Sequence, residues 1–430
     1  MTRNWRTFQF SKAVQVNPKT ELMRGRAYPF IEMQAIVPGK RSVISNEKRI
    51  FEGSGSKFKV GDTLMARITP CLENGKMARF ESSDENIGFG STEFIVIRGR
   101  EGVTDNDYVY YLTSSDEVRQ YAISQMTGTS GRQRVPTDSL DYLEVEIPPL
   151  ETQREISAIL NSIDDKIELN RKMNETLEAI AKAIFKSWFV DFDPVHAKAA
   201  GKKPVGMDDA TAALFPDSFE DSEIGNIPKG WAIEQLGDYV QIIKGKSYKS
   251  EDLKESNTAL VTLKSFLRGG GYRNDGVKSY IGAYKPEQIV KPGEIIVACT
   301  DVTQQADVIG KPALVRSDPK HETLVASLDC VILRPNNKLN IPYLYQLLMS
   351  DEYQSHIYGY VSGTTVLHLD KTGITNYKFA CPSLQTIQEY NSFAGMLIEH
   401  VNNNEKQNAA LVSIRDLLLP KLILGEIAVD

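Results

Sequence analysis

Two long segments of the chain place apolar residues at the spacing of a helix that packs against another helix. The positions seven residues apart are Ile156, Ile163, Asn170, Leu177 and Ile184 in the first segment, and Tyr390, Leu397, Asn404, Leu411 and Leu418 in the second. Other apolar residues, among them Ile159, Met173 and Ile180, complete the first stripe. Stripes of about 30 residues are typical of coiled-coil helices. The pattern predicts two long helices that each need a partner.

Each stripe contains one asparagine, Asn170 in the first and Asn404 in the second. A buried asparagine in a helix seam lowers stability but fixes the register, because its amide must find another polar group. If the two helices pair with each other, both asparagines lie near the middle of the pair. If each stripe packs on its own globular segment, the asparagines are partly solvated. Pairing is favoured, since a helix over residues 153–189 is roughly 55 Å long and outruns the side of a small domain.

Both predicted helices start with the same local sequence. Thr152 precedes Glu155 by three residues, and Thr386 precedes Glu389 by three residues. This spacing is typical of a capping box, in which the threonine accepts from a free N–H group and the glutamate reaches back. A proline shortly before each threonine disfavours helix further upstream. We expect the two threonines to cap the helices.

A segment with mixed strand and helix patterns precedes each long helix. In the first segment we expect a helical stretch at 106–126 and strands at 63–68, 93–98 and 142–147. The second segment gives the same order, with a helical stretch at 341–358 and strands at 294–299, 329–334 and 377–381. Residues 191–230 are rich in proline, glycine and aspartate, which favours an irregular connector.

The chain repeats itself once, at a distance of about 235 residues. The matched positions keep one order, with Trp5, Gly61-Asp62, Gly128-Thr129 and Pro148 corresponding to Trp231, Gly293-Glu294, Gly363-Thr364 and Pro382. A repeat of this length indicates a duplicated domain. The sequence therefore predicts an α+β fold. Its segments are a first domain (1–150), a first long helix (151–190), a connector (191–230), a second domain (231–384), and a second long helix with a C-terminal tail (385–430).

Positive charge is concentrated in two places, although the net charge is −6. Residues 1–60 carry twelve Lys or Arg against four Asp or Glu, and residues 244–291 carry ten against five. Local fields decide phosphate attraction, because distant charges are screened within roughly 10 Å. The alternative is an ordinary solvated surface. Because both stretches open a repeated domain, the two interpretations have about equal weight.

Sequence motifs for catalysis are missing from the chain. Pro148-Pro149 lacks the neighbouring polar and aromatic residues that a DNA methyltransferase acting on an amine would need. Gly245-Lys246-Ser247 has a valine where the first glycine of a phosphate-binding loop belongs. The chain also has no nucleophile elbow and no paired metal-binding histidines. We expect it to catalyse nothing itself.

The composition indicates where the protein is located and whether it binds a metal ion. No apolar run approaches 18 residues, and the first residues contain no signal-peptide core. We therefore expect a soluble cytoplasmic protein without membrane contact. The four cysteines Cys71, Cys299, Cys330 and Cys381 are scattered, which favours reduced thiols over a metal site.

Two loops at equivalent repeat positions, Gly128–Arg134 and Gly363–His368, combine glycine with hydroxyl, amide or basic side chains. Glycine lets backbone approach phosphate, hydroxyls donate to phosphate oxygens, and Arg or Gln pairs with base edges. An ordinary connection before a strand is an equally good alternative. The polar residues of the two loops differ while the scaffold positions match, as expected if each half reads a different base sequence.

The chain resembles the specificity subunit of type I restriction-modification systems. The resemblance covers the whole length. Its most specific motifs are Ala183-Ile-Phe-Lys-Ser-Trp-Phe-Val-Asp-Phe-Asp-Pro194, Leu214-Phe-Pro-Asp-Ser-Phe-Glu-Asp-Ser-Glu223, Gly225-Asn-Ile-Pro-Lys-Gly-Trp231 and Ile147-Pro-Pro-Leu-Glu-Thr-Gln-Arg-Glu155. The end of the second helix departs from the pattern, and Pro420 is expected to stop or kink it.

The resemblance implies two target-recognition domains, related by a pseudo-two-fold axis and separated by a pair of long antiparallel coiled-coil helices. Each domain would read one half of a bipartite, asymmetric site in double-stranded DNA. Two modification subunits would dock on the chain, bind S-adenosylmethionine and methylate one adenine in each half-site, and translocating restriction subunits would then join. Base flipping and methyl transfer belong to the partner, and the chain itself binds no cofactor.

Charge and repeat position, rather than any family motif, indicate which residues contact DNA. In the first domain they are Lys40, Arg41, Lys48, Arg49, Arg67, Arg132, Gln133 and Arg134. In the second domain they are Lys244, Lys246, Lys264, Arg268, Arg273, Gln304, Gln305, Thr364, Thr365 and His368. The residues expected to pair the helices are Ile156, Ile163, Asn170, Leu177, Ile184, Leu397, Asn404, Leu411 and Leu418. The alternative function is a protein-only scaffold that holds two partner copies and whose basic stretches are incidental.

Overall fold

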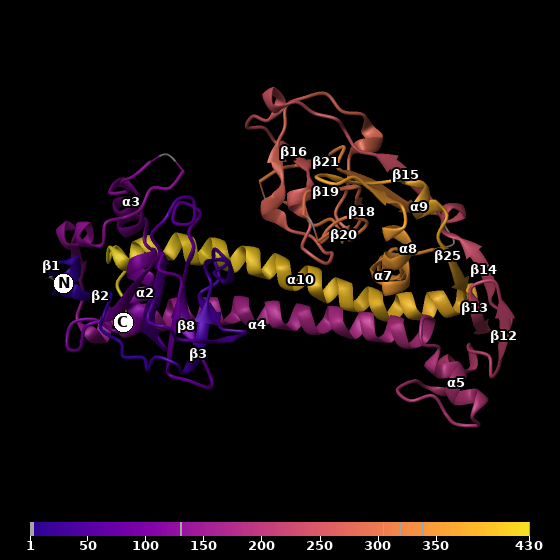
Figure 1. Cartoon of the computed structure of the whole chain (residues 1–430), viewed down its shortest axis with the longest axis horizontal. Coiled ribbons are helices and arrows are strands. Elements are labelled where there is room, and N and C mark those ends of the chain that lie inside the picture. Colours follow the sequence, from indigo (N-terminus) through magenta and orange to yellow (C-terminus); the bar gives the residue numbers. More distant parts are fainter. Residues whose placement is uncertain (1–3, 130, 304, 319, 337–338, 430) are drawn as a thin grey trace. The chain divides into compact units, whose positions relative to one another are not determined.

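The computed structural model describes residues 4–129, 131–303, 305–318, 320–336 and 339–429. The chain divides into two compact units, Met1–Lys172 with Glu405–Asp430, and Met173–Asn404. The division crosses two helices of 40 residues each, α4 (Leu150–Phe189) and α10 (Leu384–Ile423), drawn in magenta and yellow in Figure 1. Each unit therefore contains one part of α4 and one part of α10.

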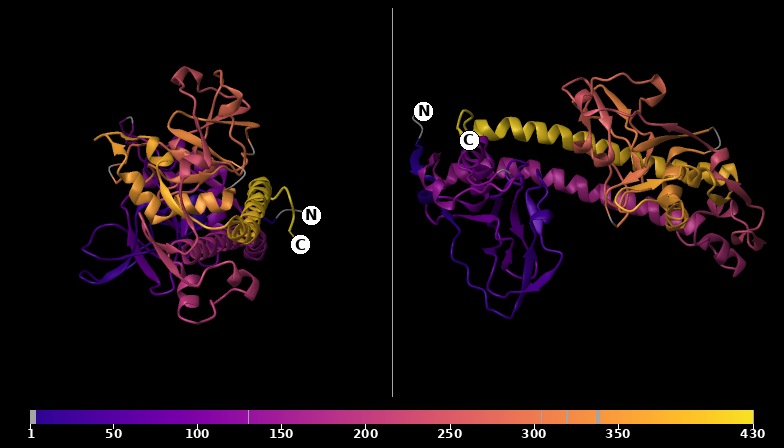
Figure 2. Two further views of the ribbon diagram at one scale, coloured as in Figure 1. Left: turned by 90° about the vertical axis from the view of Figure 1, so that its right-hand side faces the viewer. Right: turned by 45° about the horizontal axis from the view of Figure 1, so that its top comes forward.

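Within each unit the two long helices lie side by side and run antiparallel (Figure 2). In the first unit Asn170 donates to Asn408 Oδ1 at 2.8 Å and to Gln407 Oε1 at 2.7 Å. In the second unit Asn404 donates to Asn174 Oδ1 at 2.8 Å. The predicted pair of long helices is confirmed, but Asn170 and Asn404 bond to other amides rather than to each other.

The buried face of α4 differs from the predicted stripe. Ile156 and Asn170 are buried, whereas Ile159, Met173 and Ile180 are 38%, 40% and 39% exposed. Their assignment to a continuous apolar seam is wrong, because the buried line of α4 runs through Ile156, Leu160, Ile167 and Asn170, and these three residues lie beside it. The other predicted pairing residues are partly buried, namely Ile163, Leu177, Ile184, Leu397, Asn404, Leu411 and Leu418.

The first unit contains two sheets that enclose a core. The five-stranded sheet has the order β2-β10-β7-β8-β4 and the four-stranded sheet the order β5-β3-β9-β6. The strands are β2 (Val14–Val16), β3 (Ala27–Ile31), β4 (Ser42–Ile44), β5 (Lys48–Ile50), β6 (Ser56–Lys59), β7 (Thr63–Ala66), β8 (Met77–Glu81), β9 (Ile87–Gly90) and β10 (Phe94–Gly99). Ile31 and Phe58 from one sheet share a buried cluster with Leu64 and Phe80 from the other.

Short helices and a strand pair complete the first unit. The helices are α1 (Phe10–Ala13), α2 (Asn106–Ser114) and α3 (Asp116–Ser124). The strand β1 (Arg6–Gln9) pairs antiparallel with β11 (Glu144–Ile147), directly before α4. Buried residues of α2, β11 and α4 share a cluster with Leu422 and Ile423 at the end of α10. This cluster fastens both long helices to the first unit.

The second unit repeats this plan, with its strands divided among three smaller sheets. Its sheets have the orders β15-β22-β18-β20, β17-β16-β21 and β19-β24-β23. The strands are β15 (Val240–Lys244), β16 (Thr258–Val261), β17 (Lys278–Ser279), β18 (Ile295–Ala298), β19 (Thr300–Asp301), β20 (Pro312–Leu314), β21 (Thr323–Ala326), β22 (Cys330–Pro335), β23 (Val361–Ser362) and β24 (Leu367–Leu369). The strand β14 (Ala232–Gln235) pairs antiparallel with β25 (Lys378–Cys381), as β1 does with β11. One domain plan is thus used twice.

The predicted helical stretches are each divided in two by a serine. In the first unit Ser115 separates α2 from α3 and accepts from Val118 N at 3.4 Å. In the second unit Ser350 separates α7 (Ile341–Met349) from α8 (Asp351–Tyr358) and accepts from Tyr353 N at 3.2 Å. A serine with extended backbone ends one helix and caps the next. A short helix, α9 (Thr372–Thr375), precedes β25.

The long helices begin three residues earlier than the capping pattern predicts. The first backbone bond of α4 runs from Gln153 N to Pro149 O at 3.0 Å, and α10 is capped by Ser383, which accepts from Thr386 N at 3.2 Å. The prediction that Thr152 and Thr386 are the caps is therefore wrong. A proline restricts the residue before it but tolerates a helix that starts after it.

The connector and the helix end also differ from expectation. Residues 191–230 form α5 (Asp193–Ala199), α6 (Asp209–Ala213) and a hairpin of β12 (Phe219–Ser222) and β13 (Gly225–Pro228). Val195, Phe215 and Ile227 are buried in the main core of the second unit, so the prediction of an irregular connector is wrong. The helix α10 continues through Pro420 to Ile423, so Pro420 does not stop it.

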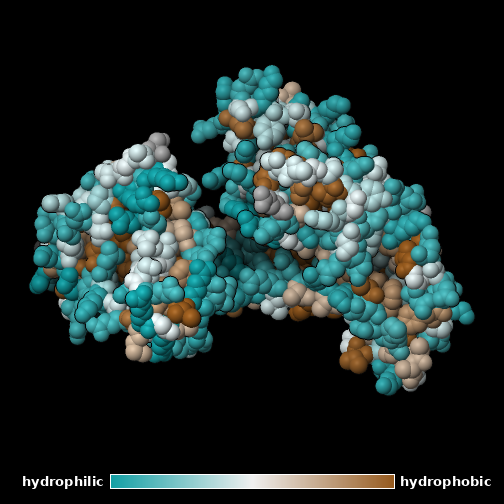
Figure 3. Space-filling model, viewed as in Figure 1, coloured by the Kyte–Doolittle hydropathy of each residue, from teal (hydrophilic) through white to brown (hydrophobic). Residues whose placement is uncertain are grey.

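The described surface carries scattered apolar residues on a largely hydrophilic background (Figure 3). Examples are Met23, Tyr142 and Val205, which are 63%, 78% and 98% exposed. No helix in the described part of the chain is long and apolar enough to cross a membrane.

Candidate nucleic-acid interface

In the first unit the loop Gly128–Arg134 folds back against the segment that follows β7. Thr127 and Arg134 exchange backbone hydrogen bonds of 2.9 and 2.8 Å, and Thr69 N donates to Gln133 O at 3.0 Å. Gly128 has a φ of 125°, a conformation that favours glycine. The loop is therefore held at both ends by backbone hydrogen bonds.

This arrangement brings four of the predicted DNA contacts together. Arg67 lies on the segment beside the loop, and its backbone oxygen accepts from Val135 N at 2.9 Å. Arg132 is exposed, whereas Gln133 and Arg134 are partly buried. Arg134 donates to Glu93 from Nε at 3.0 Å and from Nη2 at 2.7 Å. Arg132 is thus the cation of the loop that is most open to a phosphate or a base edge.

In the second unit the equivalent loop joins β23 to β24. The strand β24 also pairs with β19, which places His368 opposite Thr300. A Cβ atom on Gly363 would lie 2.2 Å from Val366 O, so this turn requires glycine. Thr364, Thr365 and His368 are all exposed.

The segment after β19 contributes the next predicted contact. The buried carboxylate of Asp301 accepts from Thr303 N and Val308 N at 2.7 Å and from Ile309 N at 3.0 Å. Burial raises the pKa of Asp301, but these backbone donors outweigh it and hold the pKa below its ordinary value. Gln305 lies exposed on this segment, whereas Gln304 falls outside the described residues. Sequence reasoning missed Glu93, because its partner Arg134 lies 41 residues away, and Asp301, because its partners are backbone groups of a loop without a recognisable motif.

The basic residues of the first stretch are paired with carboxylates of the same unit. Lys40 lies 3.5 Å from Glu168, and Lys48 lies 3.6 Å from Asp84. Arg49 pairs with Glu32 and with Glu47, and its guanidinium carbon lies 4.0 Å from the centroid of the Phe30 ring. Arg41 pairs with Asp165 on α4. These pairs leave less free positive charge here than the sequence indicates.

The basic stretch of the second unit is more open. Lys244 and Lys264 are exposed, Lys246 is partly buried, and the side chain of Arg268 is 78% exposed at 3.6 Å from Asp307. Arg273 Nε donates to Asp275 Oδ1 at 2.9 Å, and this bond lowers the pKa of Asp275.

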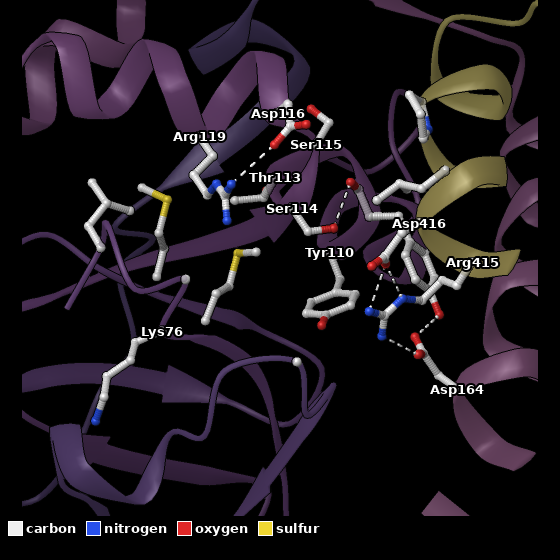
Figure 4. A pocket seen from close by; sticks show the side chains of 18 residues that line it. Lys76, Tyr110, Thr113, Ser114, Ser115, Asp116, Arg119, Asp164, Arg415 and Asp416 are labelled. Atoms are coloured by element: carbon white, nitrogen blue, oxygen red, sulfur yellow. Dashed lines mark hydrogen bonds and ion pairs between the residues drawn. The ribbon is translucent and has the colours of Figure 1, made fainter. Parts of the chain in front are cut away.

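A cavity of about 320 Å³ lies in the first unit beside the long helices (Figure 4). Its wall includes Tyr110, Arg119, Asp164 and Arg415. Arg415 reaches from α10 and donates to Asp164 Oδ1 at 2.9 Å and to Asp416 Oδ1 at 2.8 Å. Figure 4 shows these two bonds at one end of the cavity and the Arg119–Asp116 pair at the other.

Neither a disulfide nor a metal centre is evident among the residues that the structure describes. None of the four cysteines, all of which are described, forms a disulfide; Cys299 and Cys330 are buried, and Cys71 and Cys381 are partly buried. Burial raises the pKa of the Cys299 thiol to about 12. Within the same described ranges, no three His, Cys, Asp or Glu side chains could hold a metal ion together.

Comparison with known proteins identifies the family. The description "Type I restriction modification DNA specificity domain" matches residues 12–179 and 228–410. The type I restriction enzyme HindI specificity subunit of Haemophilus influenzae is 28% identical over 89% of this chain and 90% of its own length. The MjaIX specificity subunit of Methanocaldococcus jannaschii is 28% identical over 91% and 83%. The chain belongs to the family of type I restriction-modification specificity subunits.

A solved structure has the same fold. The crystal structure of a type I restriction-modification S subunit from M. genitalium aligns with a TM-score of 0.50 at 14% identity, over 98% of this chain and 96% of the other. The two-domain architecture with a pair of long helices is therefore the fold of this family.

Proposed function

We propose that the two globular domains read the two halves of a bipartite, asymmetric DNA site. The observation that carries this proposal is the pair of loops Gly128–Arg134 and Gly363–His368. Both occupy the same place in the duplicated fold, beside the segment that follows β7 or β18, but they present different side chains. Two copies of one scaffold whose loops carry different polar side chains can bind two different base sequences.

The chain supplies binding and positioning, and its partners supply the chemistry. Two modification subunits bind S-adenosylmethionine, flip one adenine in each half-site and methylate it, and restriction subunits join the same complex. Salt-dependent phosphate contacts come from lysine and arginine side chains around the loops, among them the exposed Arg132 and Arg268.

Mapping of methylated adenines in host DNA, with and without the gene, tests the proposal. We expect a split, asymmetric motif that disappears with the gene. An exchange of Arg132-Gln133-Arg134 for other polar residues should alter one half of the motif and leave the other half and the gap unchanged. A motif that stays identical after deletion of the gene, or a purified complex that binds no duplex even at low salt, would support a protein-only scaffold instead.

A further inference from the structure

A polar joint fastens the globular part of the first unit to α4. Arg41 Nη1 donates to Asn161 Oδ1 at 2.6 Å, and Arg41 Nη2 pairs with the neighbouring Asp165. One helical turn away from Asn161, Asp164 accepts from the Tyr111 hydroxyl at 2.8 Å. The side chains of Arg41 and Asp164 are only 20% and 5% exposed. Arg41 and Asp164 are thus largely withdrawn from water, whereas the Asp165 side chain is 64% exposed.

Further residues extend the joint to α10 and to the five-stranded sheet. Arg415 on α10 donates to Asp164 Oδ1 at 2.9 Å, and Asn161 Nδ2 donates to Asp107 Oδ2 at 2.9 Å. Asp107 in turn pairs with Arg79 on β8. Burial, followed by the Asp164 carboxylate, raises the pKa of Tyr111, so its hydroxyl stays protonated and donates. One network therefore connects the sheet, α2, α4 and α10.

The second unit has no counterpart of this network at the matching positions. The separation of 234 residues between Asn170 and Asn404 relates Asn161 to Gly395, Asp164 to Ile398 and Arg415 to Ala181. In the second unit Arg316 Nη2 donates to Glu178 Oε1 on α4 at 3.3 Å, and an aromatic cluster packs nearby on the helices, with the Phe185 ring centroid 5.2 Å from that of Tyr343 and 5.6 Å from that of Tyr390. The two units therefore use different contacts to fasten the same domain plan to the helices. A buried ion network contributes little net stability, but its hydrogen bonds are directional. Such a network can therefore fix the orientation of the domain on the helices.

We infer that Arg41 is a positioning residue that fixes the orientation of the first recognition domain on α4, rather than a residue that contacts DNA. Its guanidinium already donates to Asn161 and Asp165 on one helix face, which leaves little of the group for a phosphate. A planar guanidinium can bond both groups at once, whereas a lysine ammonium is a single point charge. Rotation of the domain about this joint would move its reading loop, so the joint determines which gap between half-sites is accepted. This inference rests on the proposed DNA-reading function.

The inference is tested with the complex of the full chain and its modification subunit. Binding to the mapped site is measured between about 50 and 200 mM salt for Arg41→Lys, Arg41→Gln, Asp165→Asn and the double variant Arg41→Gln/Asp165→Asn. The matched control is Arg132→Gln, which removes an exposed loop arginine. Duplexes with the gap one base pair shorter or longer measure gap discrimination. Thermal unfolding of each variant reports whether the chain is folded.

We expect Arg41→Lys, Arg41→Gln and Asp165→Asn to weaken binding by a similar factor of about 10, the scale of coupling between contacting residues. The double variant should be no weaker, the salt slope should stay as in the wild type, and discrimination between gaps should fall. Arg132→Gln should instead reduce the slope by about 0.9 and leave gap discrimination intact.

A different pattern would overturn the inference. If Arg41 holds a phosphate, Arg41→Lys binds as the wild type does, Arg41→Gln lowers the slope by about 0.9, and Asp165→Asn binds normally. If Arg41→Gln fails to fold, Arg41→Lys and Asp165→Asn still distinguish the two roles. Both weaken binding if Arg41 is a positioning residue, and both bind as the wild type does if it holds a phosphate. A wild-type complex that binds no DNA would overturn the proposed function, and this inference with it.

Discussion

At the scale of single residues, an ion pair recurs at equivalent positions of both units but differs in burial. Asp62 has no exposed surface and accepts from Arg98 Nε and Nη2 at 2.6 and 2.7 Å. The equivalent Glu294 accepts from Arg334 Nε at 2.6 Å, but these side chains are 20% and 31% exposed. Each pair joins the start of one strand to the end of its antiparallel neighbour, β7 to β10 or β18 to β22. A comparison of the two pairs therefore measures how burial changes the contribution of an ion pair to stability.

We expect Asp62→Ala to lower the free energy of unfolding of the first unit by about 3–5 kcal/mol, because Arg98 then stays buried without a carboxylate and keeps its bond to the neutral Thr20 hydroxyl. Glu294→Ala should destabilise the second unit less, since water reaches Arg334. Amide hydrogen exchange, measured separately for each β-strand, reports both losses of stability in one chain. The double variant Asp62→Ala/Arg98→Ala is the control, because it removes the unpaired arginine together with its carboxylate. Equal losses in the two units would contradict this account.

The sequence comparison matched Asp62 to Glu294 but did not identify their partners. The arginines lie 36 and 40 residues further along the chain, and strand register alone brings them close. Arg41 and Arg132 show the same limit for the candidate site. Both are arginines in basic segments, yet one pairs with α4 and the other is exposed in a loop. The sequence shows where the arginines are. Whether an arginine pairs with a carboxylate or stays exposed depends on the residues that folding brings next to it.

At the scale of elements, the start of α4 depends on a side chain that the capping pattern passed over. Gln153 has no exposed surface, and its Oε1 accepts from Asp105 N at 2.9 Å while its Nε2 donates to Val103 O and Pro148 O at 2.8 Å each. These bonds tie the first turn of α4 to the segment before α2. Thr152, the predicted cap, lies inside that turn.

We expect Gln153→Ala to destabilise the first unit by roughly 3 kcal/mol, because it leaves buried backbone groups without partners. Thr152→Ala should change stability by less than about 0.5 kcal/mol. Denaturant unfolding, followed by a probe in the first unit, measures both. A loss of about 1 kcal/mol for Thr152→Ala would instead be the result expected of a true cap.

Helices and strands with a long hydrophobic pattern were predicted better from the sequence than those with a short one. The periodicity of α4 and α10 extends over dozens of residues, and strands such as β7 and β18 carry continuous apolar runs. The short strands β3, β6 and β9 mix Pro, Lys and Gly with their apolar residues, so their alternation is weak. The connector was misjudged because Val195 and Ile227 are isolated apolar residues whose burial depends on tertiary packing.

At the scale of the whole molecule, the two long helices are the elements that both units share. The amide contacts lie on either side of the division, Asn170 with Asn408 in the first unit and Asn174 with Asn404 in the second. An insertion between Lys172 and Met173, matched by one between Asn404 and Glu405, would therefore leave the helix contacts of each unit intact. Seven residues make nearly two full turns, so each helix keeps its facing side.

We expect such a paired insertion of one heptad to lengthen the gap in the methylated site and to leave both half-sequences unchanged. Seven residues add about 10 Å of helix, and base pairs rise about 3.4 Å each, so the gap should grow by about three base pairs. Adenine methylation mapped across host DNA is the measurement. A paired insertion of three residues, which turns each helix by about 300°, should instead abolish methylation. An altered base preference after the heptad insertion would contradict the separation of reading domains from spacer helices, because no loop residue changes in that variant.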